Sequence, residues 1–196
     1  MRILQALPAL YSGGVERGTV EFAAELVKRG HESFVVSNGG PMAEQVRGQG
    51  STHIHMPIHR KTPASFGQIL PMRKLLQELR PDIVHVRSRM PAWIIHLALK
   101  TLPADQQPAV VSTFHGMYSV NPYSAIMSKA NQIIAVSNCV RDYVLRNFKV
   151  PDDKLTVIQR GVDIDAFRNR AINDQWLDIL LSRFPQLAGK KIIMMP

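Results

Sequence analysis

Two adjacent glycines near the N-terminus form the first candidate site. Gly13 and Gly14 stand between a short apolar run and a segment whose apolar residues recur at helical spacing. Such a turn places free backbone amides and a helix N-terminus at the carboxyl edge of a parallel sheet, where phosphate is stabilised. A dinucleotide fingerprint is excluded because G-x-G-x-x-G is missing, and a P-loop is excluded because Thr19 stands where its lysine is required. On the turn alone, a structural tight turn is the simpler interpretation.

Three further polar residues follow predicted strands. Arg87 and Arg89 come just after residues 82–86, at the edge where open sheets bind ligands, so they are candidates for holding an anionic group. Solvated surface charge is the simpler interpretation of both. Ser137 precedes a predicted helix and is expected to cap it, with a substrate contact as the alternative.

The histidines and the cysteine do not indicate a metal or nucleophilic site. Of seven histidines only His53, His55 and His59 cluster. A strand would put the first two on one face, but Pro57 prevents the spacing that would bring the third beside them, and no Asp, Glu or Cys completes a ligand set. Cys139, the single cysteine, lies in a predicted helix and is expected in the buried core.

The composition indicates a folded protein with an anionic partner. The 196 residues are 45% apolar, which excludes a disordered tail or a disulfide mini-scaffold. The net charge of +9 favours nucleic acid, a phosphorylated small molecule or an acidic membrane face as partner. A lone cysteine forms no internal disulfide, so a reducing, cytoplasmic location is expected. No run reaches the roughly 20 apolar residues of a membrane span, and Pro8 interrupts the N-terminal run too early for a signal peptide.

Short apolar runs alternate with amphipathic segments, which predicts an α/β fold with a Rossmann-like, doubly wound sheet of about seven parallel strands. The predicted strands are residues 3–7, 33–37, 52–56, 82–86, 109–113, 133–136 and 155–158. The predicted helices are residues 15–29, 42–49, 65–79, 92–100, a segment through 129, 137–148 and 174–184. The first helix is expected to bury Phe22 together with Val15, Ala23, Leu26 and Val27. Residues 190–195 resemble a new strand, so we expect one domain over 1–188 and the start of another over 189–196.

Several motifs, taken together, resemble the N-terminal domain of retaining, two-domain (GT-B) glycosyltransferases of family four. They are GGVER at 13–17, FAAEL at 22–26, RGHE at 29–32, RPDIVH at 80–85, TFHG at 113–116, IIAVS at 133–137 and VIQRGVD at 157–163. The resemblance spans about residues 1–168 and is specific for the family but not for a substrate. The C-terminal domain that chiefly holds the donor in this family is not in the chain.

The resemblance implies a role for each matching residue. Gly13 and Gly14 would meet the donor diphosphate, as would Arg160 and Gly161, although relatives often have Asn at position 160 and a surface arginine is an equal alternative. His115 would be the catalytic residue, its ring nitrogen binding a hydroxyl of the donor sugar; capping the loop 114–119 is the alternative. The expected acceptor contacts are Glu16, Arg87, Tyr118 and Ser137, and Asp163 is expected to cap a turn.

By resemblance, the full-length protein would transfer a sugar from a nucleotide diphosphate donor with retention, without a cofactor or metal. The acceptor would be a lipopolysaccharide, another bacterial envelope glycan or a lipid-linked sugar, and the isolated chain would be inactive. Two alternatives remain: a non-catalytic Rossmann-like module that binds an anionic ligand, and an epimerase of the same two-domain fold.

The segment 45–81 is the candidate membrane surface. It carries five of the nine net positive charges, with Met56, Ile58, Phe66 and Ile69 between them. A basic surface with apolar residues beside it can rest on an anionic bilayer at the inner face of the membrane, each charge contributing about 1 kcal/mol. An ordinary amphipathic helix with a buried side is the alternative. Nucleic acid is not expected, because no helix-turn-helix or stacking aromatic sheet is found.

Overall fold

The computed structural model describes residues 1–161, 164 and 174–191, and the chain divides into two compact units, 1–160 and 161–196. The first unit contains a seven-stranded sheet in which all strands are parallel. The strand order is β3-β2-β1-β4-β5-β6-β7. The strands are β1 Arg2–Ala6, β2 Glu32–Ser37, β3 Thr52–His55, β4 Ile83–Val86, β5 Ala109–Phe114, β6 Gln132–Ala135 and β7 Leu155–Val157. The predicted doubly wound Rossmann-like fold is confirmed.

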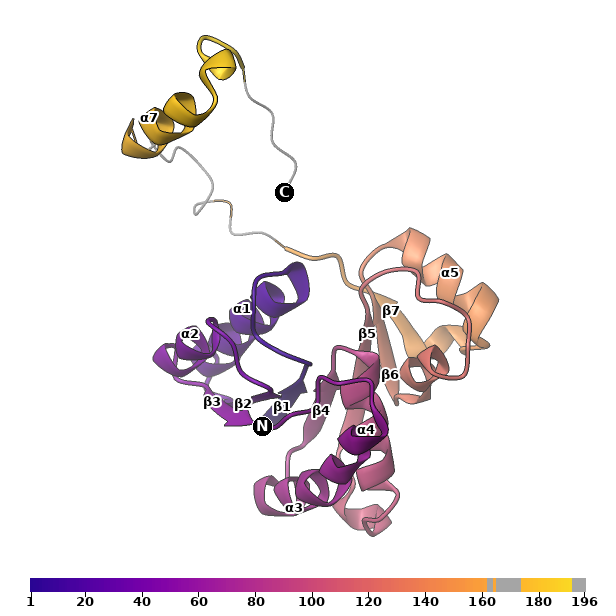
Figure 1. Ribbon diagram of the computed structural model, residues 1–196. Helices are drawn as coiled ribbons and strands as arrows, with labels where there is room; N and C mark the ends of the chain where they lie inside the picture. The colour runs from indigo at the N-terminus through magenta and orange to yellow at the C-terminus, as the bar shows by residue number, and fades with distance from the viewer. Residues whose placement is uncertain (162–163, 165–173, 192–196) are drawn as a thin grey trace. The chain divides into compact units, whose positions relative to one another are not determined.

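The helices cover the two faces of this sheet unequally (Figure 1). The helices of the first unit are α1 Gly14–Lys28, α2 Ala43–Gly48, α3 Ile69–Leu79, α4 Arg89–Leu99 and α5 Asn138–Phe148, with 3₁₀ turns η1 Pro63–Gln68, η2 Ala104–Gln106, η3 Ser124–Lys129 and η4 Asp152–Lys154. Side chains of α1 and α2 pack with Leu7 and Val35 in a small core. Those of α3, α4, η3 and α5 form the larger core on the other face. This division follows from the strand order, in which β2 and β3 lie on one side of β1 and β4 to β7 lie on the other. Because parallel crossovers are right-handed, the helices that connect the two sets of strands lie on opposite faces of the sheet.

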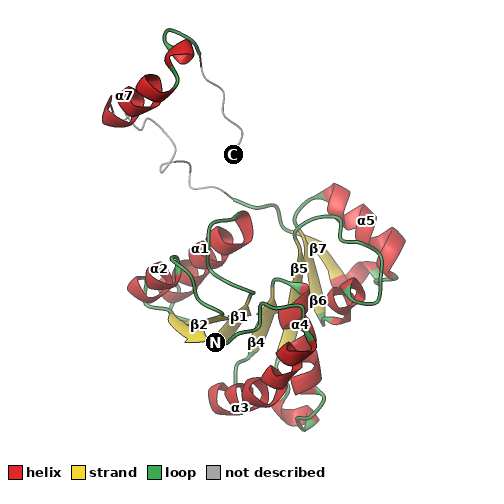
Figure 2. Ribbon diagram, viewed as in Figure 1, coloured by secondary structure: helices red, strands yellow, loops and turns green. Residues whose placement is uncertain are grey.

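Some predicted boundaries shift. The helix expected over 65–79 is divided into η1 and α3, and Pro71 stands in the first turn of α3, where a missing N–H costs nothing. The helix expected from residue 92 is α4, which begins at Arg89. Figure 2 shows α3 and α4 among the helices, drawn in red. The interpretation of Phe22 as core is wrong: its side chain is 38% exposed, and α1 instead buries Thr19, Val20, Ala23 and Leu26.

The loops that follow β1 and β2 support each other. The Leu10 N–H donates to the Gly39 carbonyl at 2.8 Å, and the Leu10 carbonyl accepts from the Met42 N–H at 3.0 Å. Gly40 adopts φ 137°, and a Cβ atom there would collide with the Leu10 carbonyl group. Glycine is therefore required at this position both by conformation and by close approach. The turn holds the segment that leads to Gly13.

The second unit contains α7 Asp174–Arg183 and η5 Pro185–Leu187. This α7 matches the helix expected over 174–184. Ile179 of α7 and Phe184, which follows the helix, are exposed. Asp163 and most of the strand expected at 190–195 lie outside the described residues. Within the described part of the chain, no helix is long and apolar enough to cross a membrane.

Candidate functional site

The turn between β1 and α1 presents the N-terminus of α1 with two charged side chains over it. Gly13 is the N-cap and supplies no side-chain hydrogen bond, so the first amides of the helix keep their donors. The Glu16 carboxylate lies against Gly13 and the Arg160 guanidinium against Gly14, because a Cβ atom at either glycine would collide with these groups. The glycines thus allow a close approach to the helix N-terminus, and in this structure Glu16 takes the position beside Gly13.

Arg160 is an exposed arginine that lies close to α1. Its guanidinium lies along the first turns of α1, within 3.3 Å of where a Cβ atom at Gly18 would stand. Nη2 is 4.0 Å from the Glu21 carboxylate, in an ion pair that is about half exposed. Arg160, in the segment after β7, therefore places a cation beside the N-terminus of α1.

Arg87 is buried, contrary to the interpretation of a solvated surface charge. Its residue exposure is 8%, and its N–H donates to the Ala6 carbonyl at 3.0 Å, which fixes it beside the end of β1. The guanidinium carbon lies 5.7 Å from the centre of the Phe22 ring. Burial, followed by the charge of Arg160, lowers the Arg87 pKa to about 10, so the side chain stays cationic at neutral pH.

His115 follows β5 and carries a buried ring nitrogen, Nε2, that has no hydrogen-bond partner among the described residues. Burial, with smaller effects from the charges of Arg87 and Arg160, lowers the His115 pKa to about 4. The imidazole is therefore neutral at pH 7. A neutral imidazole with one unused ring nitrogen can donate or accept one hydrogen bond, according to its tautomer.

Two polar residues that sequence reasoning missed lie beneath these groups. His85 Nε2 and Thr113 Oγ1 are 2.7 Å apart in the buried region between β4 and β5. The His85 ring contacts the Phe22 ring edge to face, with centroids 6.0 Å apart. A signal was present in the sequence, because His85 and Arg87 are two residues apart, as are Thr113 and His115, and alternate residues of a strand share a face.

Tyr118 and Arg89 hold the loop after β5 in place. The Tyr118 hydroxyl accepts from the His115 N–H at 3.4 Å, and its ring packs 5.2 Å from that of Phe114. The Arg89 guanidinium lies 4.9 Å from the centre of the Tyr118 ring and donates to Ser124 Oγ. Arg89 therefore has a structural place in the loop rather than a solvated one.

Among the described residues, Ser137, Gly161 and Cys139 are the remaining candidates. Ser137 Oγ accepts from the Val140 N–H at 3.2 Å and caps α5, as expected. Gly161 has no positive φ, and no atom lies within 4 Å of its would-be Cβ atom, so the geometry shows no steric reason for glycine. Cys139 is exposed, so its expected place in the core is wrong; it occupies the outer face of α5.

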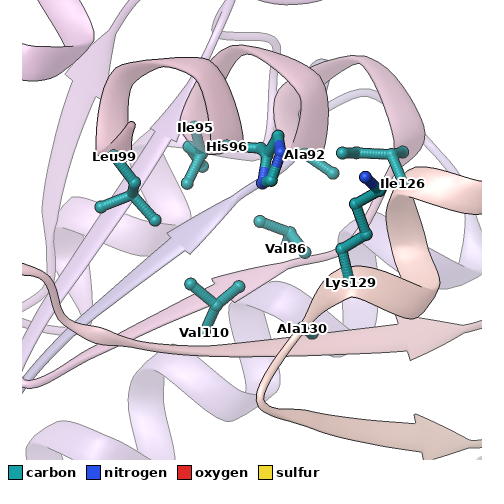
Figure 3. Close-up of a pocket in the computed structure, with 9 residues that line it drawn as sticks. All are labelled: Val86, Ala92, Ile95, His96, Leu99, Val110, Ile126, Lys129 and Ala130. Carbon is teal, nitrogen blue, oxygen red and sulfur yellow. The ribbon is translucent and has the colours of Figure 1, made fainter. Parts of the chain in front are cut away.

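Within the described part of the chain, neither the histidine cluster nor the cavity beside α4 offers a second site of comparable chemistry. Among the described residues, no group of three His, Cys, Asp or Glu side chains is arranged to hold a metal ion. His53 instead bonds Ser37 Oγ at 2.9 Å. A cavity of about 30 Å³ lies between α4, η3 and the sheet, with His96 and Lys129 at its apolar walls (Figure 3). That volume suits about one water molecule, not a sugar.

The arrangement is suited to binding oxyanions. Arg160 lies beside the N-terminus of α1, and the charges of both Arg87 and Arg160 act on the neutral imidazole of His115. These groups stand at the carboxyl edge, where ligands bind in open α/β sheets. Paired acid and base carboxylates are not seen among the described residues of the site. This chemistry stabilises negative charge that develops on a ligand.

Comparisons with known proteins agree with this geometry. Residues 12–166 match the family described as Glycosyltransferase Family 4. The fold is similar to a glycosyltransferase from Rickettsia africae ESF-5, with a TM-score of 0.77 and 36% identity over 99% of this chain and 52% of that one. It is also similar to HepE of Anabaena in complex with UDP and glucose (TM-score 0.67, 17% identity, 96% of this chain and 50% of that one). A third similar structure is the lipopolysaccharide outer core galactosyltransferase WaaB (TM-score 0.64, 15% identity, 84% and 47%). The chain spans about half the length of these relatives.

Proposed function

Because the chain belongs to glycosyltransferase family 4, we propose that it is the acceptor-side domain of a two-domain enzyme that transfers a sugar with retention. The donor is a nucleotide diphosphate sugar, and the acceptor is an envelope glycan or a lipid-linked sugar. The observation that carries the proposal is the unpartnered Nε2 of neutral His115 beside two arginines at the carboxyl edge of the sheet. A second domain would supply most of the donor contacts.

The donor diphosphate would meet the N-terminus of α1. As the bond to the sugar breaks, charge develops on the leaving phosphate, and the amides after Gly13 together with Arg160 stabilise it. The Glu16 carboxylate must first leave Gly13, because two anions cannot share that position. Gly161 stays a predicted donor contact on resemblance alone.

His115 would bind a hydroxyl group of the donor sugar. At pH 7 its imidazole is neutral, because its pKa is lowered to about 4. It therefore orients the sugar by a hydrogen bond and is not a general acid at that pH. No cofactor or metal is required for this role.

The acceptor would enter on the side of Arg87 and Tyr118. Glu16, once it has left Gly13, is a hydrogen-bond acceptor for a sugar hydroxyl. Tyr118 and Ser137 already use their hydroxyl groups within the protein. Each can contact an acceptor only by a further bond, so we expect both to contribute mainly by positioning.

The segment 45–81 would rest on an anionic membrane at its cytoplasmic face. Met56 and Ile58 are buried in the core and contribute nothing to such a surface. Phe66 and Leu70, by contrast, are 42% and 68% exposed. Exposed Arg60, Lys61 and Lys74 come from the same segment. This combination of exposed apolar and basic side chains supports membrane docking near a lipid-linked acceptor.

The test is turnover by the intact protein supplied with a panel of nucleotide diphosphate sugars and an envelope glycan extract. We expect release of the nucleoside diphosphate and a sugar-extended product whose anomeric configuration matches the donor. His115→Ala should lower kcat by about 10²-fold, while Cys139→Ala, an exposed site on α5, serves as the matched control. The chain of residues 1–196 alone should be inactive. Ligand binding without any donor consumption by the intact protein would favour the non-catalytic module instead.

A further inference from the structure

We propose that Arg87 binds an oxyanion group, a phosphate or a carboxylate, carried by the acceptor. This inference rests on the function proposed above and makes it more specific. It concerns the class of acceptor, which the resemblance leaves open. Its basis is the burial of Arg87, its missing partners and its contact with Phe22, well beyond the first turn of α1.

Arg87 is a buried cation without a carboxylate. Its residue is 8% exposed, and none of the ion pairs or side-chain hydrogen bonds of the described residues involves its guanidinium. Arg160, whose charge contributes to the lowered pKa of Arg87, is of the same sign. Buried charges are normally paired, because an unpaired one is strongly destabilising. An anionic ligand would supply the missing partner.

The guanidinium is held so that its tip remains available. Nε is fully buried and has no partner, whereas the two terminal nitrogens are not among the buried atoms without one. Phe22 covers one side, its ring centre 5.7 Å from the guanidinium carbon, and His85 supports Phe22 from below. A guanidinium fixed in this way is preorganised for the paired oxygen atoms of a carboxylate or phosphate.

The donor diphosphate is not the expected occupant. Phe22 is eight residues beyond Gly14 on α1, which corresponds to about 12 Å along the helix axis. Arg87 therefore stacks on a part of α1 about two turns beyond the first amides. Arg160, which lies over Gly14 and Gly18, is the arginine placed for the donor. This leaves Arg87 for a separate anion.

Calorimetric titration of the intact protein with three probes tests the proposal. We expect glucose 6-phosphate and glucuronate to bind and glucose to bind at least about tenfold more weakly, because only the first two carry an oxyanion. Both should also raise the pKa of His115 from its value of about 4, since a bound anion offsets the repulsion from Arg87. The imidazole proton signal of His115 reports this change.

Variants locate the anion. Arg87→Gln should abolish the preference for the charged probes, and Arg87→Lys should restore part of it. Lys28→Gln removes one positive charge from the far end of α1 and should retain the preference. If Arg87→Gln does not fold, Arg160→Gln takes its place: loss of the preference in that variant would assign the anion to Arg160 and overturn the proposal. Equal binding of all three probes, or a preference that survives Arg87→Gln, overturns the proposal.

The rate of donor consumption separates this inference from the proposed function. Arg87→Gln should leave the KM for the nucleotide sugar unchanged, and a large increase would assign Arg87 to the donor and overturn the inference. If no variant consumes a donor but the charged probes still bind through Arg87, the proposed function fails and the anion subsite stands. If donor is consumed without any preference for charged probes, the function stands and the subsite fails.

Discussion

His85 on β4 and Thr113 on the neighbouring β5 are joined by a buried contact of 2.7 Å between Nε2 and Oγ1. The His85 ring also meets the Phe22 ring at an interplanar angle of 87°. Because Phe22 in turn covers Arg87, a polar contact inside the sheet supports the wall of the candidate site. Burial, with a smaller effect from the charge of Arg87, holds the pKa of His85 well below its usual value, so the ring is neutral at pH 7.

Removal of the Thr113 hydroxyl should destabilise the fold. Thr113→Val keeps the shape but leaves His85 Nε2 buried without a partner, at a cost of about 1–3 kcal/mol. Thr113→Ser retains the hydroxyl and should lose less. Urea unfolding monitored by circular dichroism measures both. Equal stability of the valine variant and the wild type would show that water replaces the hydroxyl.

Gly40 and Gly48 should respond in opposite ways to alanine. At Gly40, φ is 137° and a Cβ atom would meet the Leu10 carbonyl, so Gly40→Ala should cost roughly 1–3 kcal/mol or more. Gly48 ends α2 with open space around its would-be Cβ atom, and Gly48→Ala should be neutral or stabilising by up to about 1 kcal/mol. Thermal unfolding of the two variants provides the comparison. A Gly40→Ala protein as stable as the wild type would contradict the close approach.

Stability should fall as the solution is acidified from pH 7 to pH 5. The pKa of His115 is about 4 in the folded protein against 6.5 for the free side chain, so between these values the unfolded state binds more protons. The contribution of His115 to the free energy of unfolding is therefore fully present above pH 6.5 and is lost as the pH falls toward 4. The loss from His115 at pH 5 is about 2 kcal/mol.

Substitution of this histidine tests the source of the acid sensitivity. His115→Asn should lose less stability between pH 7 and pH 5 than the wild type, as measured by urea unfolding at both pH values. His55→Asn, which changes an exposed imidazole on β3, is the control and should follow the wild type. Parallel pH profiles for all three proteins would show that burial of His115 does not determine the effect.

Vesicle binding should depend on the exposed apolar residues of the segment 45–81. Replacing Phe66 and Leu70 together by serine should weaken binding of the intact protein to phosphatidylglycerol vesicles by about tenfold or more, because each buried apolar side chain contributes about 1.5–3 kcal/mol. Cosedimentation measures the effect. The matched control replaces Val120 and Ile179, which are 57% and 66% exposed elsewhere in the chain. An equal loss of vesicle binding in both double variants would show that binding depends on exposed apolar side chains in general and not on the segment 45–81.

The sheet could be predicted from the sequence because each parallel strand is a short apolar run bounded by turns, and each crossover has a helical period. The helix N-terminus behind Gly13 and the cap at Ser137 depend on adjacent residues and were also predictable. The strand boundaries agree to within about two residues, which reflects how locally these signals are encoded.

The burial of Arg87 depends on long-range contacts and could not be predicted in the same way. It requires β4 to lie beside β1 and α1 to place Phe22 over the strand end, and neither fact is local. Phe22 shows why: its helical spacing is that of a core residue, yet it stands at the margin of the core and covers a cation. The prediction for Cys139 was wrong for a similar reason. It relied on the tendency of cysteine to be buried and not on the position of the residue in the first turn of α5.

Arg160 is the last residue of the first compact unit, and its side chain lies over the beginning of the first helix. The residue at which the chain leaves the first unit is therefore also the residue that places a positive charge beside Gly14. A change in the backbone at this residue would also move the positive charge that lies beside Gly14.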